Sequence, residues 1–206
     1  MMEKRGVFKV KENPFEQFKI WFEDACQEKR IDKPDAFCLS TMAESGFPRS
    51  RILLLRKVEN ERFYFFTNYE SEKMKDITFS TKVALNFFWD PLGYQVRILG
   101  EAKKASAVIS DAYHQSRSRE KQLSAWASPQ SQEIRSRDEL VSNVDSFRKR
   151  FESEEVIPRP SFWGGVEVTP SYYEFWQDGQ DRLHDRFAYN LSENPEKGWG
   201  LSRLAP

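Results

Sequence analysis

The pattern of hydrophobic positions changes its period near residue 36. Before that point, apolar residues recur at intervals of three and four, as on one face of a helix: Phe15, Phe18, Phe22 and Cys26, with Trp21 and Ala25 beside them. Asn13 and Pro14 are typical of a helix start. The pattern therefore predicts a helix from Asn13 to about Arg30 that packs one face on an apolar surface.

From Ala36 onward hydrophobic and polar positions alternate, which is the period of strands. The predicted strands are Ala36–Met42, Arg49–Val58, Arg62–Asn68, Lys82–Trp89, Tyr94–Lys104, Val166–Thr169, Tyr172–Gln177, Arg182–Tyr189 and Trp199–Leu204. Helical patterns interrupt them at Ser71–Phe79, where Ser71 could act as the cap, and at Ala107–Ser116 and Asp138–Phe151. The helix predicted over Asp138–Phe151 carries Leu140, Val144, Phe147 and Phe151 on one side.

Short turns between the strands favour antiparallel pairing, and closing such a sheet removes its exposed edges. We therefore expect a mostly β fold with peripheral helices (α+β), built on an antiparallel barrel. A length of 206 residues suits one domain over 13–206, preceded by a short tail over 1–12.

The composition of the chain indicates which classes of binding partner to expect. Thirty-two basic and 32 acidic residues give no net charge, so no basic field attracts nucleic acid or acidic membranes. Aromatic residues make up 15% of the chain, enough for a sheet-rich core and for stacking on a planar ligand.

The two cysteines and the hydropathy of the chain indicate where in the cell the protein is expected. Cys26 and Cys38 form no cluster that zinc would need, so we expect a reduced, metal-free protein. The first residues lack a signal-like apolar region and no run of 18 apolar residues occurs. We therefore expect a cytoplasmic protein that does not span a membrane.

A basic group near the carboxyl end is the first candidate for chemistry. If Arg182 to Tyr189 is extended, Arg182, His184 and Arg186 share one face. Burying these charges without partners is costly, so an anion such as a phosphate ester is a natural counterpart. A solvated edge strand with alternating charges is the alternative, and this stretch leaves both open.

Four other clusters carry weaker signals. Arg49 to Lys57 is an apolar strand bracketed by cations, which equally fits a buried strand with charged ends. Phe65 to Lys73 places hydroxyls, a helix start and a lysine within one loop, as a phosphate cradle would. Gln95 could bond a heterocycle or the backbone, and Ser124 to Ser131 reads as a polar loop.

Several site types are disfavoured. His114 and His184 are the only histidines, and neither lies in a recognised nucleophile motif. The chain contains no G-x-G-x-x-G or P-loop pattern.

Taken together, the chain from Asn13 to Pro206 resembles the pyridoxine (pyridoxamine) 5′-phosphate oxidase family. The most specific matches are four motifs: Phe162-Trp-Gly-Gly165, Glu174-Phe-Trp-Gln177, Arg182-Leu-His-Asp-Arg186 and Arg203-Leu-Ala-Pro206. The resemblance implies a split β-barrel that binds flavin mononucleotide (FMN) at a homodimer interface. It implies oxidation of pyridoxamine 5′-phosphate or pyridoxine 5′-phosphate to pyridoxal 5′-phosphate, with hydride passing from C4′ to flavin N5 and O₂ giving H₂O₂.

The resemblance also implies roles for individual residues. The flavin-binding positions are Arg51, Ile52, Leu53, Leu54, Phe66, Thr67, Lys73, Gln95, Gln130, Ser131, Trp176 and Arg186. The substrate-binding positions are Arg56, Tyr113, Arg117, Lys121, Arg182 and His184. Of these, Arg182 and His184 would lie over the pyridine ring beside the reacting carbon as the catalytic residues.

Four positions depart from the family's pattern. Arg56 replaces a lysine, and its guanidinium fork is not equivalent to an ammonium group. Glu72 replaces an arginine that faces the flavin phosphate, Tyr94 replaces another arginine, and Lys121 replaces a serine near the substrate phosphate.

These departures leave three hypotheses. The first is a working oxidase whose phosphate pockets have new partners. The second is a catalytically weak paralogue that binds pyridoxal 5′-phosphate or FMN as a carrier. The third, a flavin reductase, leaves Tyr113, Arg117, Arg182 and His184 without a purpose.

Overall fold

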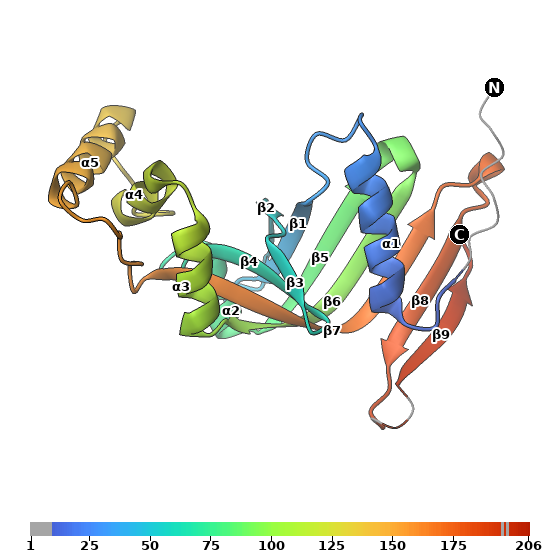
Figure 1. Ribbon diagram of the computed structural model, residues 1–206. Coiled ribbons are helices and arrows are strands. Elements are labelled where there is room, and N and C mark those ends of the chain that lie inside the picture. Colours follow the sequence, from blue (N-terminus) through green and yellow to red (C-terminus); the bar gives the residue numbers. More distant parts are fainter. Residues whose placement is uncertain (1–9, 195, 197) are drawn as a thin grey trace.

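A computed structural model describes residues 10–194, 196 and 198–206. In this part of the chain, nine strands form one sheet, and the helices lie around it (Figure 1). Its strands are β1 Ala36–Met42, β2 Pro48–Leu54, β3 Lys57–Glu59, β4 Arg62–Asn68, β5 Lys82–Trp89, β6 Tyr94–Lys104, β7 Trp163–Gln177, β8 Asp185–Leu191 and β9 Trp199–Leu204. They run antiparallel in the order β2-β1-β5-β6-β7-β4-β3, with β8 and β9 continuing from β7. The expected β-rich, antiparallel fold is confirmed.

The long strand β7 organises the sheet. One edge pairs with β6, while the other pairs first with β4 and then with β8. The register shifts between Leu99 and Gly100, opposite Pro170. A side chain at Gly100 would lie 2.3 Å from the carbonyl oxygen of Thr169, so only glycine fits where β7 bends. The sheet therefore splits beyond this bend into a β4 branch and a β8 branch.

The hydrophobic core lies between the sheet and the helix α1, Pro14–Gln27. Asn13 caps this helix by accepting a hydrogen bond from the Phe15 N–H at 2.7 Å. Phe18 packs edge-on against Phe63 and Phe87 at ring-centroid distances of 4.9 and 5.2 Å. The predicted docking face is thus confirmed, but it is centred on Trp21 and Ala25, while Phe22 is half-buried and Cys26 exposed.

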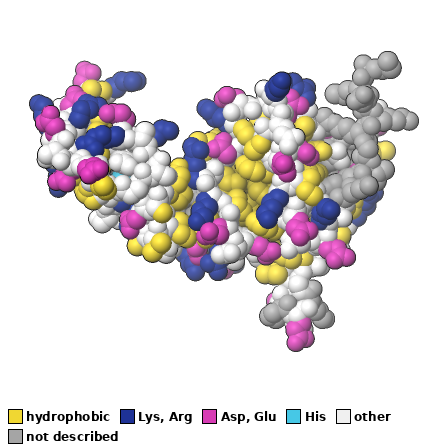
Figure 2. All heavy atoms as spheres, in the orientation of Figure 1, with side chains coloured by type: hydrophobic (Ala, Val, Ile, Leu, Met, Phe, Trp, Pro, Cys, Tyr) yellow, Lys and Arg dark blue, Asp and Glu magenta, His cyan; other side chains and the backbone are white. Residues whose placement is uncertain are grey.

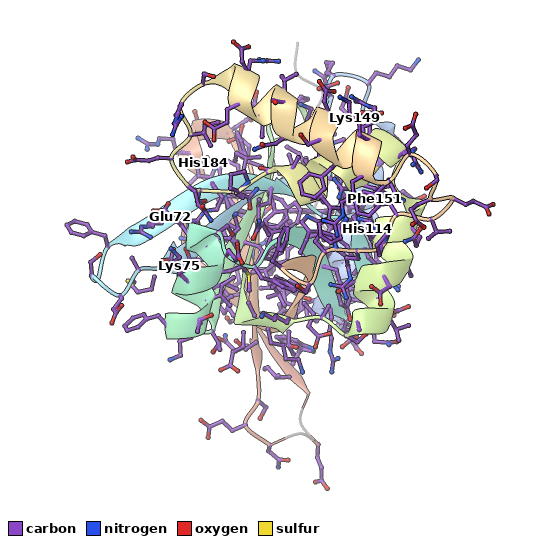
Figure 3. All side chains as sticks on the ribbon, turned by 90° about the vertical axis from the view of Figure 1, so that its left-hand side faces the viewer. Glu72, Lys75, His114, Lys149, Phe151 and His184 are labelled. Atoms are coloured by element: carbon purple, nitrogen blue, oxygen red, sulfur yellow. The ribbon has the colours of Figure 1, made fainter. Side chains whose placement is uncertain are left out.

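The remaining helices lie outside the core. Helix α2, Glu72–Phe79, packs against β1, and α3, Ala107–Ser116, packs against β7. Helices α4, Arg119–Ala127, and α5, Arg137–Arg150, project together from one end of the molecule (Figure 1). Their small separate core contains Leu123, Phe151 and Ile157, and Phe151 lies where the end of α5 meets α4 (Figure 3).

Four element predictions were wrong in detail. The single strand predicted over Arg49–Val58 is two strands, β2 and β3, with Leu55 and Arg56 between them. The strands predicted over Val166–Thr169 and Tyr172–Gln177 are one, because the chain passes through Pro170 at the register shift without ending the strand. The strand predicted to begin at Arg182 begins at Asp185.

The fourth error concerns α4. The segment from Ser124 to Ala127, expected as loop, is helical, whereas Gln130 and Ser131 do lie in a loop. The polar Gln122 is buried on this helix because its amide donates to the carbonyls of His114 and Arg117 at 3.0 and 3.1 Å. A buried glutamine hides the apolar periodicity that would have revealed the helix.

Within the described residues, no helix is both long enough and apolar enough to cross a membrane.

The core predicts a contrast between two phenylalanines. Phe87 is fully buried among aromatic rings, whereas Phe47, in the turn before β2, is 72% exposed. Phe87→Ala should lower the free energy of unfolding by about 3–5 kcal/mol because it leaves a cavity, and Phe47→Ala should change it by less than about 0.5 kcal/mol. Urea unfolding at one protein concentration measures both, and equal losses would contradict this packing.

Candidate functional site

A cavity of about 580 Å³ opens between the β2 and β4 strands and the helices α3 and α4. Ten of the residues expected to bind flavin or substrate line it: Ile52, Leu53, Leu54, Arg56, Phe66, Thr67, Tyr113, Arg117, Lys121 and Gln130. Ser116, Ser118, Phe65 and Trp163 complete the lining. Segments between residues 52 and 163 thus converge on one place. On the face drawn in Figure 2, hydrophobic side chains over the middle of the molecule lie among both basic and acidic ones.

One end of the cavity is a hydrogen-bonded cluster around Lys73. Its ammonium group lies 3.2 Å from Thr67 Oγ1, 3.0 Å from Ser71 Oγ and 2.9 Å from Gln130 Oε1. Gln130 Oε1 also accepts from the Thr67 hydroxyl at 2.9 Å. Lys73 is only 8% exposed, and burial, followed by the nearby Arg51 guanidinium, lowers the pKa of Lys73 to about 8.

The start of α2 borders this cluster. Ser71 occupies the N-cap position as expected, but its hydroxyl donates to the Asn68 carbonyl at 2.7 Å instead of capping the helix. The Glu72 N–H donates to Ser131 Oγ at 3.4 Å, which brings Ser131 to the helix N-terminus. The Glu72 carboxylate projects from α2 (Figure 3) and lies 3.7 Å from Arg49 Nη1. An acidic residue at this position therefore has a basic neighbour of its own.

Arg51, expected to contact flavin, is held by a buried carboxylate. Asp76 Oδ2 accepts from the Thr41 hydroxyl at 2.7 Å and lies 3.6 Å from Arg51 Nη2. Asp76 Oδ1 accepts from Arg49 at 3.1 Å, and Arg51 Nη1 donates to Thr41 Oγ1 at 2.7 Å. Asp76 therefore fixes both arginines beside the Lys73 cluster.

The opposite end of the cavity combines aromatic rings with cations. Phe66 stacks on Tyr113 at 3.7 Å, and Trp163 lies parallel to both. The Arg117 guanidinium lies 4.6 Å above the Trp163 ring, and its buried Nη1 has no hydrogen-bond partner. Burial and the neighbouring Arg56 lower the pKa of Arg117. Arg56 itself pairs with Asp35 at 3.0 Å, and Lys121 is exposed on α4.

A second group of expected site residues lies on the C-terminal strands. Trp176 on β7 is in register with Gln95 on β6 and Arg186 on β8. Arg186 donates to Glu174 Oε1 at 3.0 and 2.9 Å, and Arg97 pairs with Glu174 Oε2 at 3.0 Å. The His184 ring packs on the Trp176 ring at 4.7 Å. Tyr94 is not part of this group because it stacks on Trp21 of α1 at 4.0 Å.

The predicted face of Arg182, His184 and Arg186 is wrong in its geometry. Only Arg186 lies in a strand. Arg182 ends a short 3₁₀ turn over Gln180–Arg182 and has a φ of +64°, so the side chains do not alternate as they would in an extended chain. His184 nevertheless reaches the Trp176 ring through this turn, whereas Arg182 is exposed.

The two groups lie at opposite ends of β7. Trp163, which borders the cavity, begins the strand, and Trp176 lies thirteen residues further along it. A strand of that length spans roughly 40 Å. Gln95, Trp176, His184 and Arg186, together with Arg182, are called the His184 group below. Within one copy of the chain, this group and the cavity therefore lie far apart along β7.

Sequence reasoning missed several residues of these groups. Asp76 carried no motif signal, because a lone acidic residue on a helix normally faces solvent. Trp163 and Glu174 lay inside quoted motifs, but nothing in their spacing predicted an aromatic wall or a carboxylate shared by two arginines. Among the described residues, no group of three or more His, Cys, Asp or Glu side chains is arranged to hold a metal ion.

Comparisons with known proteins agree with this architecture. A family model described as "Pyridoxamine 5′-phosphate oxidase" matches residues 22–151. A second, described as "Pyridoxine 5′-phosphate oxidase C-terminal dimerisation region", matches residues 163–206. The second match contains β7, β8 and β9, and therefore the whole His184 group except Gln95.

Similar proteins match over nearly their whole length. The chain is 44% identical to the pyridoxine/pyridoxamine 5′-phosphate oxidase of Salinibacter ruber, covering 96% of this chain and 91% of that protein. It is 45% identical to the protein of that name from Rippkaea orientalis, covering 94% and 90%.

Solved structures give the same fold. PhzG from Burkholderia lata 383, in complex with tetrahydrophenazine-1-carboxylic acid, matches with a TM-score of 0.88 at 25% identity, covering 98% of both chains. A pyridoxamine 5′-phosphate oxidase-related, FMN-binding protein from Nostoc punctiforme matches with a TM-score of 0.73 at 14% identity, covering 96% of this chain and all of the other. The fold is thus the split β-barrel of FMN-binding proteins. The two family models and the curated relatives place the chain more narrowly: it belongs to the pyridoxine/pyridoxamine 5′-phosphate oxidase family.

The buried carboxylate in the site generates a stability prediction. Asp76→Ala removes the acceptor shared by Thr41, Arg49 and Arg51, and it should lower the free energy of unfolding by about 3 kcal/mol. Asp145→Ala breaks an exposed ion pair with Arg148 on α5 and should cost less than about 1 kcal/mol. Urea denaturation of both variants provides the comparison, and an Asp76 variant as stable as the Asp145 variant would show that the carboxylate is dispensable.

Proposed function

We propose that this protein is an FMN-dependent oxidase that converts pyridoxamine 5′-phosphate or pyridoxine 5′-phosphate to pyridoxal 5′-phosphate, with O₂ as acceptor and H₂O₂ as product. Family membership supports the reaction. The observation that carries the proposal for this chain is the cavity, because Arg56, Arg117 and Lys121 line it beside stacked aromatic rings, while its residues Thr67 and Gln130 join it to the buried Lys73 cluster. A flavin and a substrate that each carry one phosphate need two such cationic groups.

The residues present fit FMN. The hydrogen-bond partners of Lys73 are two hydroxyls and an amide, all neutral, so its charge is not compensated within that cluster. A buried cation with neutral partners favours an anionic ligand. The start of α2 adds its N-terminal dipole to the same place. We therefore assign Thr67, Lys73, Gln130 and Ser131 to the flavin phosphate, with Arg51 beside them.

The departure at Glu72 is compatible with this assignment. Its carboxylate lies against Arg49, which also pairs with Asp76. The negative charge introduced at residue 72 therefore has a compensating cation on β2. The flavin site therefore stays compatible with a bound phosphate, as a working oxidase with altered pairing requires.

Arg117, Arg56 and Lys121 are assigned to the substrate phosphate. Arg117 lines the cavity and has a buried, unpartnered Nη1. Its guanidinium lies over the Trp163 ring, which is parallel to Tyr113. Lys121 adds an ammonium donor on α4 to the same lining. These groups would fix the phosphate end of the substrate and thereby orient its ring along the aromatic wall.

The catalytic site in this proposal is shared between two copies of the chain. Arg182, His184, Trp176, Gln95 and Arg186 belong to the β8 end of the sheet, far along β7 from the cavity. A second copy that docks through its C-terminal strands would bring its own group to the cavity of the first. The match of residues 163–206 to a dimerisation region supports this arrangement.

In such a site each element of the chain has a defined task. FMN, when bound, supplies the hydride acceptor and the route to O₂. The cavity holds both phosphates and excludes water from the aromatic wall, while Arg182 and His184 of the second copy orient the substrate ring beside its reacting carbon. Trp176 and Gln95 would contact the flavin, and Arg186, fixed by Glu174, would do so from β8.

The direct test is to purify the protein, record its flavin spectrum and follow pyridoxal 5′-phosphate formation from both substrates. Turnover with stoichiometric FMN in a dimer is the expected result. Flavin binding without turnover would support the carrier instead, and a stable monomer would contradict the shared site.

The roles assigned to the C-terminal group predict a separation of effects. His184→Ala and Arg182→Ala should each lower kcat/KM by about tenfold or more, because substrate orientation is lost, while FMN content stays near that of the unaltered protein. Lys73→Met should instead lose FMN. Steady-state kinetics and flavin absorbance of the same preparations measure both properties, and equal FMN loss in all three variants would contradict the division.

The low pKa of Lys73 predicts how FMN binding depends on pH. In the free protein Lys73 loses its proton as pH rises through about 8, whereas the flavin phosphate, with a second pKa of about 6, is already a dianion. Since the phosphate binds the protonated amine better, FMN affinity should be constant from pH 7 to about 8 and then fall by up to about tenfold per pH unit. Flavin fluorescence titrations at fixed ionic strength measure this dependence.

Lys73→Arg is the matched control for that titration. It keeps a charge that does not titrate in this range, so its affinity for FMN should not fall between pH 8 and 9.5. The same pH slope in this variant and the unaltered protein would assign the effect to another group.

A further inference from the structure

The turn that carries His184 contains an acidic residue to which no role has been given. Asp178 follows the end of β7, and its carboxylate Oδ1 lies 3.1 Å from His184 Nδ1. The Gly179 N–H also points to Nδ1, at 3.2 Å. Both neighbours therefore lie at the same edge of the imidazole, and Nε2 is left on the other edge.

The backbone of this turn is closely constrained. The Asp178 N–H donates to the Gly93 carbonyl at 2.9 Å, which anchors the turn to the end of the neighbouring hairpin. A side chain at Gly179 would lie 2.0 Å from the carbonyl oxygen of Leu183, so the two ends of the turn meet where only glycine fits. The His184 ring also packs on Trp176, with a tilt of 44°. The position of the imidazole is thus set by its own turn and by β7.

The two neighbours of Nδ1 serve different protonation states. When Nδ1 carries a proton, it can donate to Asp178, and a hydrogen bond to a carboxylate is stronger than one between neutral groups. When Nδ1 has no proton, it can accept from Gly179. The same ring orientation is therefore hydrogen-bonded in either state.

We propose that Asp178 is a positioning residue for His184: together with the Gly179 N–H it holds the Nδ1 edge, so that Nε2 faces the substrate whether or not Nδ1 is protonated. This inference rests on the proposed function where it concerns the role of His184 in turnover. The geometry of the turn does not depend on that function. Asp178 itself is exposed and is not among the residues that line the cavity. Its effect on the reaction therefore passes through the imidazole.

The first test needs neither substrate nor activity. His114 and His184 are the only histidines, so ¹H–¹⁵N spectra of the imidazoles in ¹⁵N-labelled holoprotein contain two sets of signals, which His184→Ala assigns. Asp178→Ala should shift the Nδ1 signal of His184 and leave His114, which is fully buried on α3, unchanged. An unchanged His184 signal would overturn the contact.

The second test is kinetic. Loss of one hydrogen bond to the imidazole should lower kcat by about fivefold in Asp178→Ala, with FMN content and substrate KM unchanged. Asp178→Asn keeps an acceptor oxygen and should restore most of the lost kcat. Gln180→Ala, an exposed position in the same turn, is the control for general disturbance of the turn and should match the unaltered protein.

A double-mutant cycle separates the two proposals. If Asp178 acts through His184, Asp178→Ala should cause no further loss in a His184→Ala background. A full further loss there, or an unchanged kcat in Asp178→Ala alone, would overturn the positioning role. An unchanged kcat in His184→Ala would instead overturn the role proposed for His184 in turnover, and the imidazole spectra would still decide whether Asp178 holds the ring.

Discussion

The register of β7 is the constraint on which the rest of the molecule depends. This strand pairs with β6 along one edge and with β4 and then β8 along the other. Its first residue, Trp163, forms the aromatic wall of the cavity, and Trp176 near its end supports His184. Because side chains alternate between the faces of a strand, a slip of one residue would turn both tryptophans to the opposite face. One strand therefore sets the geometry of both groups of site residues.

Charge is distributed unevenly in a protein with no net charge. Arg51 and Arg186 are each held by a buried carboxylate, Asp76 and Glu174 respectively. Lys73 has only neutral hydrogen-bond partners in its cluster, and Arg117 has a buried nitrogen without one. Arg51 and Arg186 are thus neutralised within the protein, whereas Lys73 and Arg117 can still bind an anion. Because they are buried, these two cations attract an anion more strongly than exposed cations would.

The division of the site along β7 connects the fold to the reaction. A cavity with two cationic ends can hold a flavin and a phosphorylated substrate, but the groups proposed to act on the substrate ring lie at the other end of the sheet. Assembly of two copies through residues 163–206 would join the two halves. In that assembly, the tight turn from Asp178 to His184 would present an imidazole in a fixed orientation to the cavity of the other copy.

The sequence by itself determined most of the elements and the family. The limits of β1, β4, β5, β6 and α3 followed from period and turn residues, because each element has its own amphipathic pattern. Local motifs also identified most of the residues that line the cavity.

Tertiary structure decided the features that depend on residues distant in the sequence. Gln122 could be buried in α4 only because carbonyls of α3 accept from it, and β7 could pass through Pro170 because β6 shifts its register there. Arg182 lies outside the strand because the turn closes at Gly179. Asp76 belongs to the site because β1 and β2 bring Thr41 and Arg51 to it. Such contacts join residues far apart in the chain, which no local pattern encodes.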